Sequence, residues 1–349
     1  MSQQTTTAHA WQFDGYGRPR EVLSWRQHSL PAPGPGQALV RLHAIGMNRS
    51  EFNYVQGRYQ PAREFPSCLG QEAVGEIVAL GPAGQDDAAA WSQTPLEVGA
   101  RVALLPGRID LCSTGAYRDI GCYPQAALLP VPDTYNDVEG AALWMGVLTM
   151  GGALELAGIT PDTAAGKRLL VTAASSSMGV VALKLARAWG ATTLATSRSE
   201  TKMATLTGLA DHAFVASDSD SLAAGIAAAT DGEGFDAALD PVGAAFYPAM
   251  VASAAVGASI VSYELITGQD TPLPIAKVMI KDLALRGYTI YRPLRQPVLL
   301  ERILGWGLEY ADAIRPIIAG TRSLSDAPDA LEELGRAEHL GKLVLLPEA

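Results

Sequence analysis

The first third of the chain alternates apolar and polar residues in short stretches that end at proline or glycine. Ala38 to Leu42 and Gly75 to Leu80 are two such stretches, and turn residues recur between them. Successive side chains of a strand point to opposite faces, so a period of two residues predicts strands with one buried face. The pattern therefore predicts a compact β-rich domain in this part of the chain.

From Val138 onward, apolar helical stretches alternate with short runs rich in β-branched residues. Six of these runs are predicted strands: Arg168 to Thr172, Thr192 to Thr196, His212 to Ala216, Phe235 to Leu239, Ala258 to Ser262 and Leu283 to Ile290. Strand and helix in alternation are typical of a parallel sheet with helices on both faces, and six strands suit a dinucleotide-binding fold. We therefore predict an α/β protein whose second domain is doubly wound.

The last part of the chain returns to a different pattern. It predicts long helices over Val298 to Ala313 and Ala327 to Ala337, and a closing strand over Gly341 to Leu346. This tail is too short for a domain of its own, so we expect it to dock on the β-rich N-terminal part. Ala83 to Pro95, which lacks periodicity, is predicted to be an exposed loop between two strands.

Composition and charge exclude several classes of protein. Hydrophobic residues make up 48% of the 349 positions and charged residues 18%, which excludes a disordered chain. The net charge of -10 argues against nucleic-acid or anionic-membrane partners, which require clustered Lys and Arg. No apolar run approaches the roughly 20 residues of a membrane span, and the first ten residues do not resemble a signal peptide. We predict a cytoplasmic protein with three reduced cysteines.

The strongest local signal is an apolar strand, a turn of small residues and a helix, over Leu169 to Trp189. Such a turn points backbone N–H groups and the positive helix end at a pyrophosphate. If Gly179 is the third glycine of the G-x-G-x-x-G fingerprint, the first two are Ala174 and Ser176. An ordinary β-α turn would look similar. The residues predicted to contact the cofactor phosphates are Ala174, Ser176, Ser177, Met178 and Gly179.

The end of the next predicted strand indicates which dinucleotide is used. NAD sites usually place Asp or Glu there to bind the ribose 2′-hydroxyl, whereas this strand runs into Ser197 and Arg198, with Lys202 four residues further on. Two cations and a hydroxyl suit the 2′-phosphate of NADPH, although a solvated helix start is the plainer interpretation. Cations at a helix N-terminus oppose the macrodipole, which favours an anionic ligand. We predict NADPH as the cofactor.

Six sequence elements resemble, in order, those of the zinc-independent quinone oxidoreductase branch of the medium-chain dehydrogenase/reductase superfamily. They are Gly46 to Glu51, Gly57 to Tyr59, Leu69 to Gly75, Leu148 to Thr149, Leu239 to Gly243 and Gly341 to Val344. The resemblance implies a GroES-like catalytic domain at 1–135 and 294–349, with a Rossmann NADP-binding domain inserted at 136–293. It also implies cofactor contacts at Thr149 and Val242, and a homodimer paired through the edge strand of the nucleotide domain. Tyr263, after the fifth strand, is a further predicted contact, because ligands bind at the carboxyl ends of such strands.

The resemblance departs from the zinc-dependent members at the metal positions. Those members hold zinc with a Cys and a His where this chain has Met47 and Gln71. Neither side chain is a good zinc ligand, and the five histidines have no ligand spacing, so no metal site is predicted.

Without zinc, alcohol oxidation loses its usual Lewis acid, and reduction of a quinone or an α,β-unsaturated carbonyl is easier to support. Such a site has only to align the partners and to hydrogen-bond the acceptor oxygen. Asn48 and Tyr59, with Tyr54 as a weaker third, are the predicted orienting residues, although a half-buried packing aromatic is an equal interpretation of Tyr59.

Three alternatives stay open at this point. Leu285 to Tyr288 resembles the L-R-G-F of 2-enoyl thioester reductases, which keeps thioesters among the substrates. A specialised-metabolite dehydrogenase and a non-catalytic NADPH-binding sensor or structural protein are the others, since fold alone does not determine function.

Overall fold

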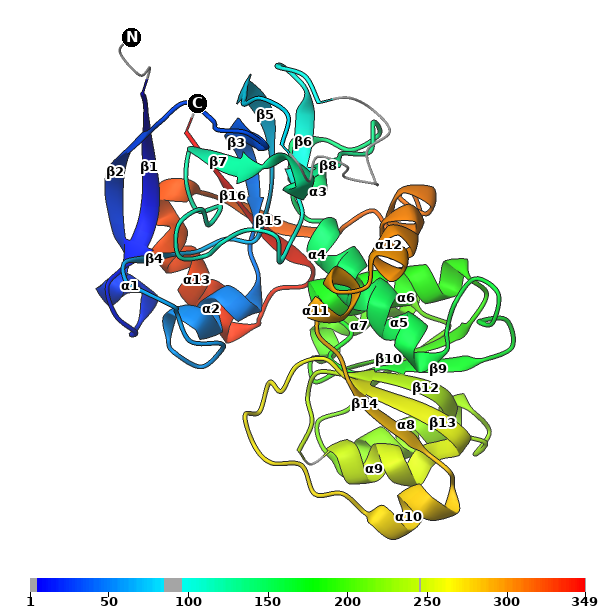
Figure 1. Cartoon of the computed structure of the whole chain (residues 1–349). Coiled ribbons are helices and arrows are strands. Elements are labelled where there is room, and N and C mark those ends of the chain that lie inside the picture. Colours follow the sequence, from blue (N-terminus) through cyan, green and yellow to red (C-terminus); the bar gives the residue numbers. More distant parts are fainter. Residues whose placement is uncertain (1–4, 85–95, 245, 349) are drawn as a thin grey trace. The chain divides into compact units, whose positions relative to one another are not determined.

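The computed structural model describes residues 5–84, 96–244 and 246–348, which form two compact units (Figure 1). The first consists of residues 1–145 and 316–349, and the second of residues 146–315. The chain therefore leaves the first unit, forms the second, and returns to complete the first. This confirms the expected α/β class, with a β-rich unit and a parallel-sheet unit.

The first unit is built on a seven-stranded sheet in the order β15-β16-β3-β5-β6-β8, with β7 paired to β3. Its strands are β3 (Gln37–Gly46), β5 (Glu72–Leu80), β6 (Arg101–Leu104), β7 (Ile120–Pro124), β8 (Leu128–Pro130), β15 (Ile318–Ser323) and β16 (Lys342–Leu346). A smaller sheet contains β1 (Thr6–Phe13), β2 (Ser24–Leu30) and β4 (Ser67–Cys68). Val344 pairs with Gly46, so the closing strand docks on the N-terminal part as expected.

Helices of the first unit are short and pack against this core. They are α1 (Pro19–Val22), α2 (Arg49–Val55), α3 (Asp137–Gly140) and α13 (Ala327–Arg336). Helix α13 buries Ala327, Ala330, Leu331 and Leu334, at the i, i+3, i+4, i+7 spacing of one helical face. This face joins the core cluster of the first unit and covers α2.

The second unit is a six-stranded parallel sheet in the order β11-β10-β9-β12-β13-β14. Its strands are β9 (Arg168–Val171), β10 (Thr192–Ser197), β11 (His212–Val215), β12 (Phe235–Asp240), β13 (Ala254–Ser262) and β14 (Ala284–Gly287). Numbered along the chain, this is the 3-2-1-4-5-6 order of dinucleotide-binding folds, in which the order reverses beside β9. The predicted doubly wound domain is confirmed.

Helices cover both faces of this sheet, with α5 and α6 on one face and α8 and α9 on the other (Figure 1). The helices are α4 (Trp144–Gly146), which crosses the unit boundary, α5 (Gly152–Ala157), α6 (Ser177–Ala188), α7 (Met203–Leu209), α8 (Ser219–Ala229), α9 (Phe246–Ser253), α10 (Ile275–Ile280), α11 (Tyr291–Leu294) and α12 (Pro297–Glu309). A π-helical turn, Val147–Gly151, precedes α5.

The two units divide ten residues later in the chain than predicted at the first boundary, and twenty-two residues later at the second. The N–H of Met145 donates to Glu72 Oε2 at 2.9 Å, which ties the segment before residue 146 to the first unit. Helix α12 instead packs on the π-helical turn, and its Trp306 stacks edge-on against Trp189 with ring centroids 4.9 Å apart. Burial of this apolar helix therefore assigns it to the second unit.

Two further expectations from the sequence concern an exposed loop and the lack of a membrane span. Most of the loop predicted at Ala83 to Pro95 lies outside the described residues. One stretch, Asp137–Ala157, is long and apolar enough to cross a membrane, but 83% of its most apolar window is buried in the protein. A core helix of a soluble protein has these properties.

Candidate functional site

The turn after β9 presents backbone N–H groups at the carboxyl edge of the parallel sheet. Ala173 adopts a left-handed conformation with φ 47°, and the N–H of Ala174 donates to Thr196 O at 2.9 Å. Ser176 caps α6, because its Oγ accepts a hydrogen bond from Gly179 N at 3.1 Å. Ser176, Ser177 and Met178 are half-buried and Ala174 is buried. The turn thus ends at the positive end of α6, where a phosphate binds favourably.

Gly179 allows α6 to approach this turn closely. A Cβ at position 179 would lie 2.5 Å from the carbonyl oxygen of Ala174. This is the role of the third glycine in the dinucleotide fingerprint, and it is present although the first two glycines are replaced.

The end of β10 presents an exposed cation. Arg198 is exposed and forms no hydrogen bond or ion pair with the residues that the structure describes. Ser197 beside it is 6% exposed, and its Oγ accepts a hydrogen bond from Ser199 N at 3.2 Å. Lys202 ends the short helix that follows and is half-buried. The adjacent Thr196 Oγ1 is buried without a hydrogen-bond partner in the described chain.

The ends of β12 and β13 complete this edge. Asp240 is fully buried and accepts hydrogen bonds from Val242 N at 3.2 Å and Gly243 N at 2.8 Å, so it holds the turn that contains Val242. Burial raises the pKa of Asp240. The Tyr263 hydroxyl is buried near the Ser176 side chain without a well-aligned hydrogen bond among the described residues. Thr149 lies in the π-helical turn and is half-buried.

These features fit a nicotinamide dinucleotide. Gly179 lets the start of α6 approach the turn closely, and the N-terminal end of a helix favours a pyrophosphate. Arg198 is an exposed cation at the end of the neighbouring strand β10. At the same edge of the sheet, the buried hydroxyls of Thr196 and Tyr263 have no well-aligned hydrogen-bond partner among the described residues. All the residues predicted to bind the cofactor lie in the second unit.

The predicted orienting residues all lie in the first unit, around α2. Asn48 precedes α2 and is 6% exposed. Tyr54 lies on α2, is 3% exposed and bonds Ser67 Oγ at 2.7 Å; burial raises its pKa to about 12. Tyr59 follows the left-handed Gly57 and is 42% exposed. Of these three side chains, Tyr59 is therefore the most accessible.

A buried charged cluster beside Asn48 was not predicted from the sequence. Glu51, Glu72 and Lys342 are each at most 2% exposed, and Lys342 forms an ion pair with Glu72. Each lies in one of three separate elements of the family pattern, Gly46 to Glu51, Leu69 to Gly75 and Gly341 to Val344. The available signal was that each of these three elements carries a charged residue near glycines. Charged residues are rarely buried in proteins unless they are paired.

Glu51 receives four hydrogen bonds inside this cluster. Oε2 accepts from Asn48 N at 2.8 Å and from the Tyr117 hydroxyl at 2.9 Å. Oε1 accepts from Gln71 N at 3.1 Å and from Asn48 Nδ2 at 3.4 Å. Burial outweighs these donors and the nearby Lys342 charge, and raises the pKa of Glu51 to about 7.

The two positions that correspond to zinc ligands in the zinc-dependent members are buried. Met47 is 1% exposed and Gln71 is 4% exposed, and no group of three His, Cys, Asp or Glu residues suited to a metal occurs in the described part of the chain.

We expect activity to be unchanged by a strong chelator and by added zinc, because thioether and amide groups at these two positions bind zinc poorly. Assay after dialysis against chelator, together with elemental analysis, is the measurement. Stoichiometric zinc, or activity that only metal restores, would contradict the expectation.

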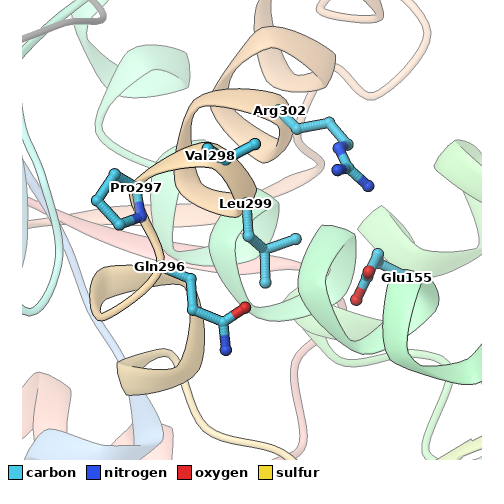
Figure 2. Close-up of a pocket in the computed structure, with 6 residues that line it drawn as sticks. All are labelled: Glu155, Gln296, Pro297, Val298, Leu299 and Arg302. Atoms are coloured by element: carbon cyan, nitrogen blue, oxygen red, sulfur yellow. The ribbon is translucent and has the colours of Figure 1, made fainter.

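One surface pocket of about 300 Å³ lies in the second unit between α5 and the start of α12. Figure 2 shows Leu299 near the centre of the lining, with Glu155 of α5 and Arg302 of α12 on one side of it and Gln296 on the other. Arg292 pairs with Glu155 at 3.3 Å. None of the predicted site residues lines this pocket, so it is separate from the residues predicted to contact the cofactor.

Two family descriptions match the chain. Residues 34–134 match the alcohol dehydrogenase GroES-like domain, and residues 177–304 match the zinc-binding dehydrogenase family. The second match excludes positions 47 and 71, so its name carries no information about a zinc site there.

Several similar proteins carry the names of oxidoreductases or reductases. A quinone oxidoreductase of Pseudomonas aeruginosa is 28% identical over 96% of this chain and 98% of its own length. Prostaglandin reductase-3 of Bos taurus is 26% identical over 74% of this chain, and the match spans 63% of that protein. The quinone oxidoreductase of Thermus thermophilus, solved also in complex with NADPH, has a TM-score of 0.76 and 25% identity, over 97% of this chain and 99% of that one.

Proposed function

Since the chain belongs to the medium-chain dehydrogenase/reductase superfamily, in its quinone oxidoreductase-like branch, we propose that it is an NADPH-dependent reductase of quinones or α,β-unsaturated carbonyls that works without zinc. The chain is an oxidoreductase with a nicotinamide cofactor and a small-molecule substrate. The observation that carries the proposal is Arg198 at the end of β10, which is exposed and has no partner among the described residues, together with Met47 and Gln71 at the expected metal positions. The similar quinone oxidoreductase and prostaglandin reductase support the acceptor class.

The proposed reaction gives a role to residues of each unit. A bound nicotinamide supplies the hydride. In the second unit, Ser177 and Met178 at the start of α6 would hold the pyrophosphate by backbone N–H groups, because the N–H groups of Ser176 and Gly179 already donate within the turn, and Arg198 with Lys202 would hold the 2′-phosphate. In the first unit, Tyr59 donates a hydrogen bond to the acceptor oxygen, where negative charge develops. Asn48 and Tyr54 support the segment that carries Tyr59, and solvent supplies the final proton.

Arg198→Ala is expected to weaken NADPH binding by roughly 30-fold, the equivalent of about 2 kcal/mol for one charge-assisted hydrogen bond to phosphate. NADH lacks the 2′-phosphate, so its dissociation constant should hardly change. Fluorescence titration of both cofactors with parent and variant measures this. Equal affinity of the parent for NADPH and NADH would contradict the cofactor preference.

Tyr59→Phe is expected to lower kcat by up to about 100-fold with a small change in KM, because the hydroxyl contacts charge that forms mainly in the transition state. Steady-state kinetics with a quinone acceptor measures this. Tyr16→Phe is the control, since Tyr16 is a similarly exposed tyrosine, 43% against 42%. A kcat of Tyr59→Phe equal to that of the parent would return Tyr59 to a packing role.

The reductase proposal itself is tested with NADPH deuterated at C4 of the nicotinamide. We expect deuterium at the β-carbon of reduced enones, or quinone-dependent oxidation of NADPH. Enoyl thioesters and alcohols belong in the same panel, because they separate the thioester reductase and dehydrogenase alternatives. NADPH binding without turnover of any acceptor would favour a non-catalytic sensor.

We further propose that the protein is cytoplasmic and pairs with a second copy through the β14 edge of the second unit. Strand β14 ends the sheet and lacks a neighbour on one side within the described chain. Large apolar side chains near this edge are strongly exposed: Val256 at 78%, Met279 at 75% and Ile280 at 81%. Sedimentation velocity on the parent and on Ile280→Lys tests the pairing, and a monomeric parent would exclude it.

A further inference from the structure

Three polar side chains from distant parts of the sequence meet inside the first unit. Asn48 precedes α2, Glu72 begins β5 and Lys342 begins β16. The Lys342 ammonium forms an ion pair with Glu72 Oε1 and donates to Asn48 Oδ1 at 2.7 Å. All three are buried, so solvent competes little with these bonds.

The ammonium determines which way the Asn48 amide points. Lysine has only donors, so it can bond only the oxygen end of the amide. The NH₂ end then faces acceptors, with Glu72 Oε1 at 3.2 Å and Gly46 O at 3.3 Å. Both ends of the amide are thereby used within the protein, and the side chain is held in one orientation.

The same cluster anchors the start of α2. The backbone N–H of Asn48 donates to Glu51 Oε2, and Gly46, two residues earlier, has no room for a side chain. A Cβ at position 46 would lie 2.0 Å from Ala141 O and 2.8 Å from Glu72 Oε1. Helix α2 carries Tyr54, and the turn at Gly57 leads from it to Tyr59. A displacement of Asn48 therefore moves the segment that carries both tyrosines.

We propose that Lys342 is a positioning residue for the reductase site: with Glu72 it fixes the amide of Asn48 and the start of α2, and through them Tyr54 and Tyr59. This inference rests on the proposed function, because Tyr59 is the side chain proposed to meet the acceptor. The strand that closes the chain thus contributes to catalysis without touching the substrate. Misplacement of a reacting group by about 1 Å can cost up to roughly 100-fold in rate.

The test compares variants that keep the buried charge balanced. Lys342→Met alone strands the Glu72 carboxylate in the interior, so the double variant Lys342→Met/Glu72→Gln is the main probe. We expect it to lower kcat for a quinone at least about tenfold, by misalignment of the acceptor. The dissociation constant for NADPH should stay that of the parent, since the proposed cofactor residues lie in the second unit.

Lys342→Arg is the rescue variant, because a guanidinium also donates to both Asn48 Oδ1 and Glu72; we expect kcat within about threefold of the parent. Lys167→Met is the matched control, since Lys167 lies in the second unit and its ammonium donates to Gly158 O at 2.7 Å. We expect parental kinetics from it.

Hydrogen exchange of the cofactor-free protein gives a readout independent of turnover. In the double variant we expect faster exchange of the amides of α2 and of residues 56–60, and parental exchange in the second unit. Parental kcat and parental exchange in a folded double variant would overturn the inference, as would an Arg variant as impaired as the double variant. A parent inactive towards every acceptor overturns the proposed function instead, and the exchange measurement then decides the positioning of α2 alone.

Discussion

Gly179→Ala is expected to lower the free energy of unfolding of the second unit by about 3 kcal/mol or more, the upper range for overpacking at a tight contact. Its Cβ would lie 2.5, 2.6 and 2.7 Å from the O, Cα and C atoms of Ala174. These are backbone atoms of the turn, which cannot move aside as a flexible side chain does. Helix α6 must therefore shift away from the turn, and we expect NADPH binding to fall with stability.

The matched control is Gly305→Ala. Gly305 is exposed within α12, and a Cβ there meets nothing within 4 Å. Alanine favours a helix interior by about 1 kcal/mol over glycine, so this variant should be slightly more stable than the parent. Urea unfolding and NADPH titration of both variants make the comparison. Equal stabilities of Gly179→Ala and the parent would show that the close approach of α6 is not needed.

The buried carboxyl of Glu51 predicts that the first unit loses stability as pH rises from about 4.5 to about 7. The pKa of Glu51 is raised from 4.5 to about 7 in the folded protein, chiefly by burial. The folded state therefore binds the proton more tightly than the unfolded state, and the free energy of unfolding falls across this interval. Integrated over the shift, Glu51 contributes a loss of about 3 kcal/mol, complete above pH 7.

Glu51→Gln removes this titration, so its free energy of unfolding should depend less on pH in the same interval. The Gln amide also adds donors where Asn48 N, Gln71 N and Tyr117 already donate, so we expect lower stability below pH 5. Glu76→Gln, at an exposed position of β5, controls for the loss of one negative charge. Urea unfolding at pH 5, 6, 7 and 8 measures the slopes; identical slopes for parent and Glu51→Gln would exclude Glu51 as the source.

Local patterns predicted the elements of the second unit well and their ends less well. Strand β14 ends at Gly287, whereas the apolar run continues to Ile290, because Tyr288 leaves the strand and its hydroxyl donates to Leu148 O at 2.5 Å. Gly152 makes this possible, since a Cβ there would lie 2.1 Å from the Tyr288 hydroxyl. An apolar run in the sequence indicates that its residues are buried, but it does not show whether they lie in a strand. A tyrosine packed against a helix is as buried as one in a strand.

In the candidate site, too, local segments could be recognised from the sequence, whereas contacts between distant residues could not. The turn from Ala174 to Gly179 is one short segment of the sequence, and the stretch after β10 with the two cations is another. Each is placed by its own strand and the residues that follow it, without help from the rest of the chain. Asn48 was predicted from its motif as a group that faces the acceptor, which stays a prediction. The structure adds that both ends of its amide are bonded within the first unit.

The sequence by itself determined the two kinds of unit, the strands of the parallel sheet and the turn of small residues after β9, because these depend on short-range periodicity and on small residues at close spacing. Only the tertiary structure decided that α12 belongs to the second unit and that Lys342 pairs with Glu72 beside Asn48. Residues 48, 72 and 342 are brought together by pairing among β3, β5 and β16, and burial then requires each charge to find its partner.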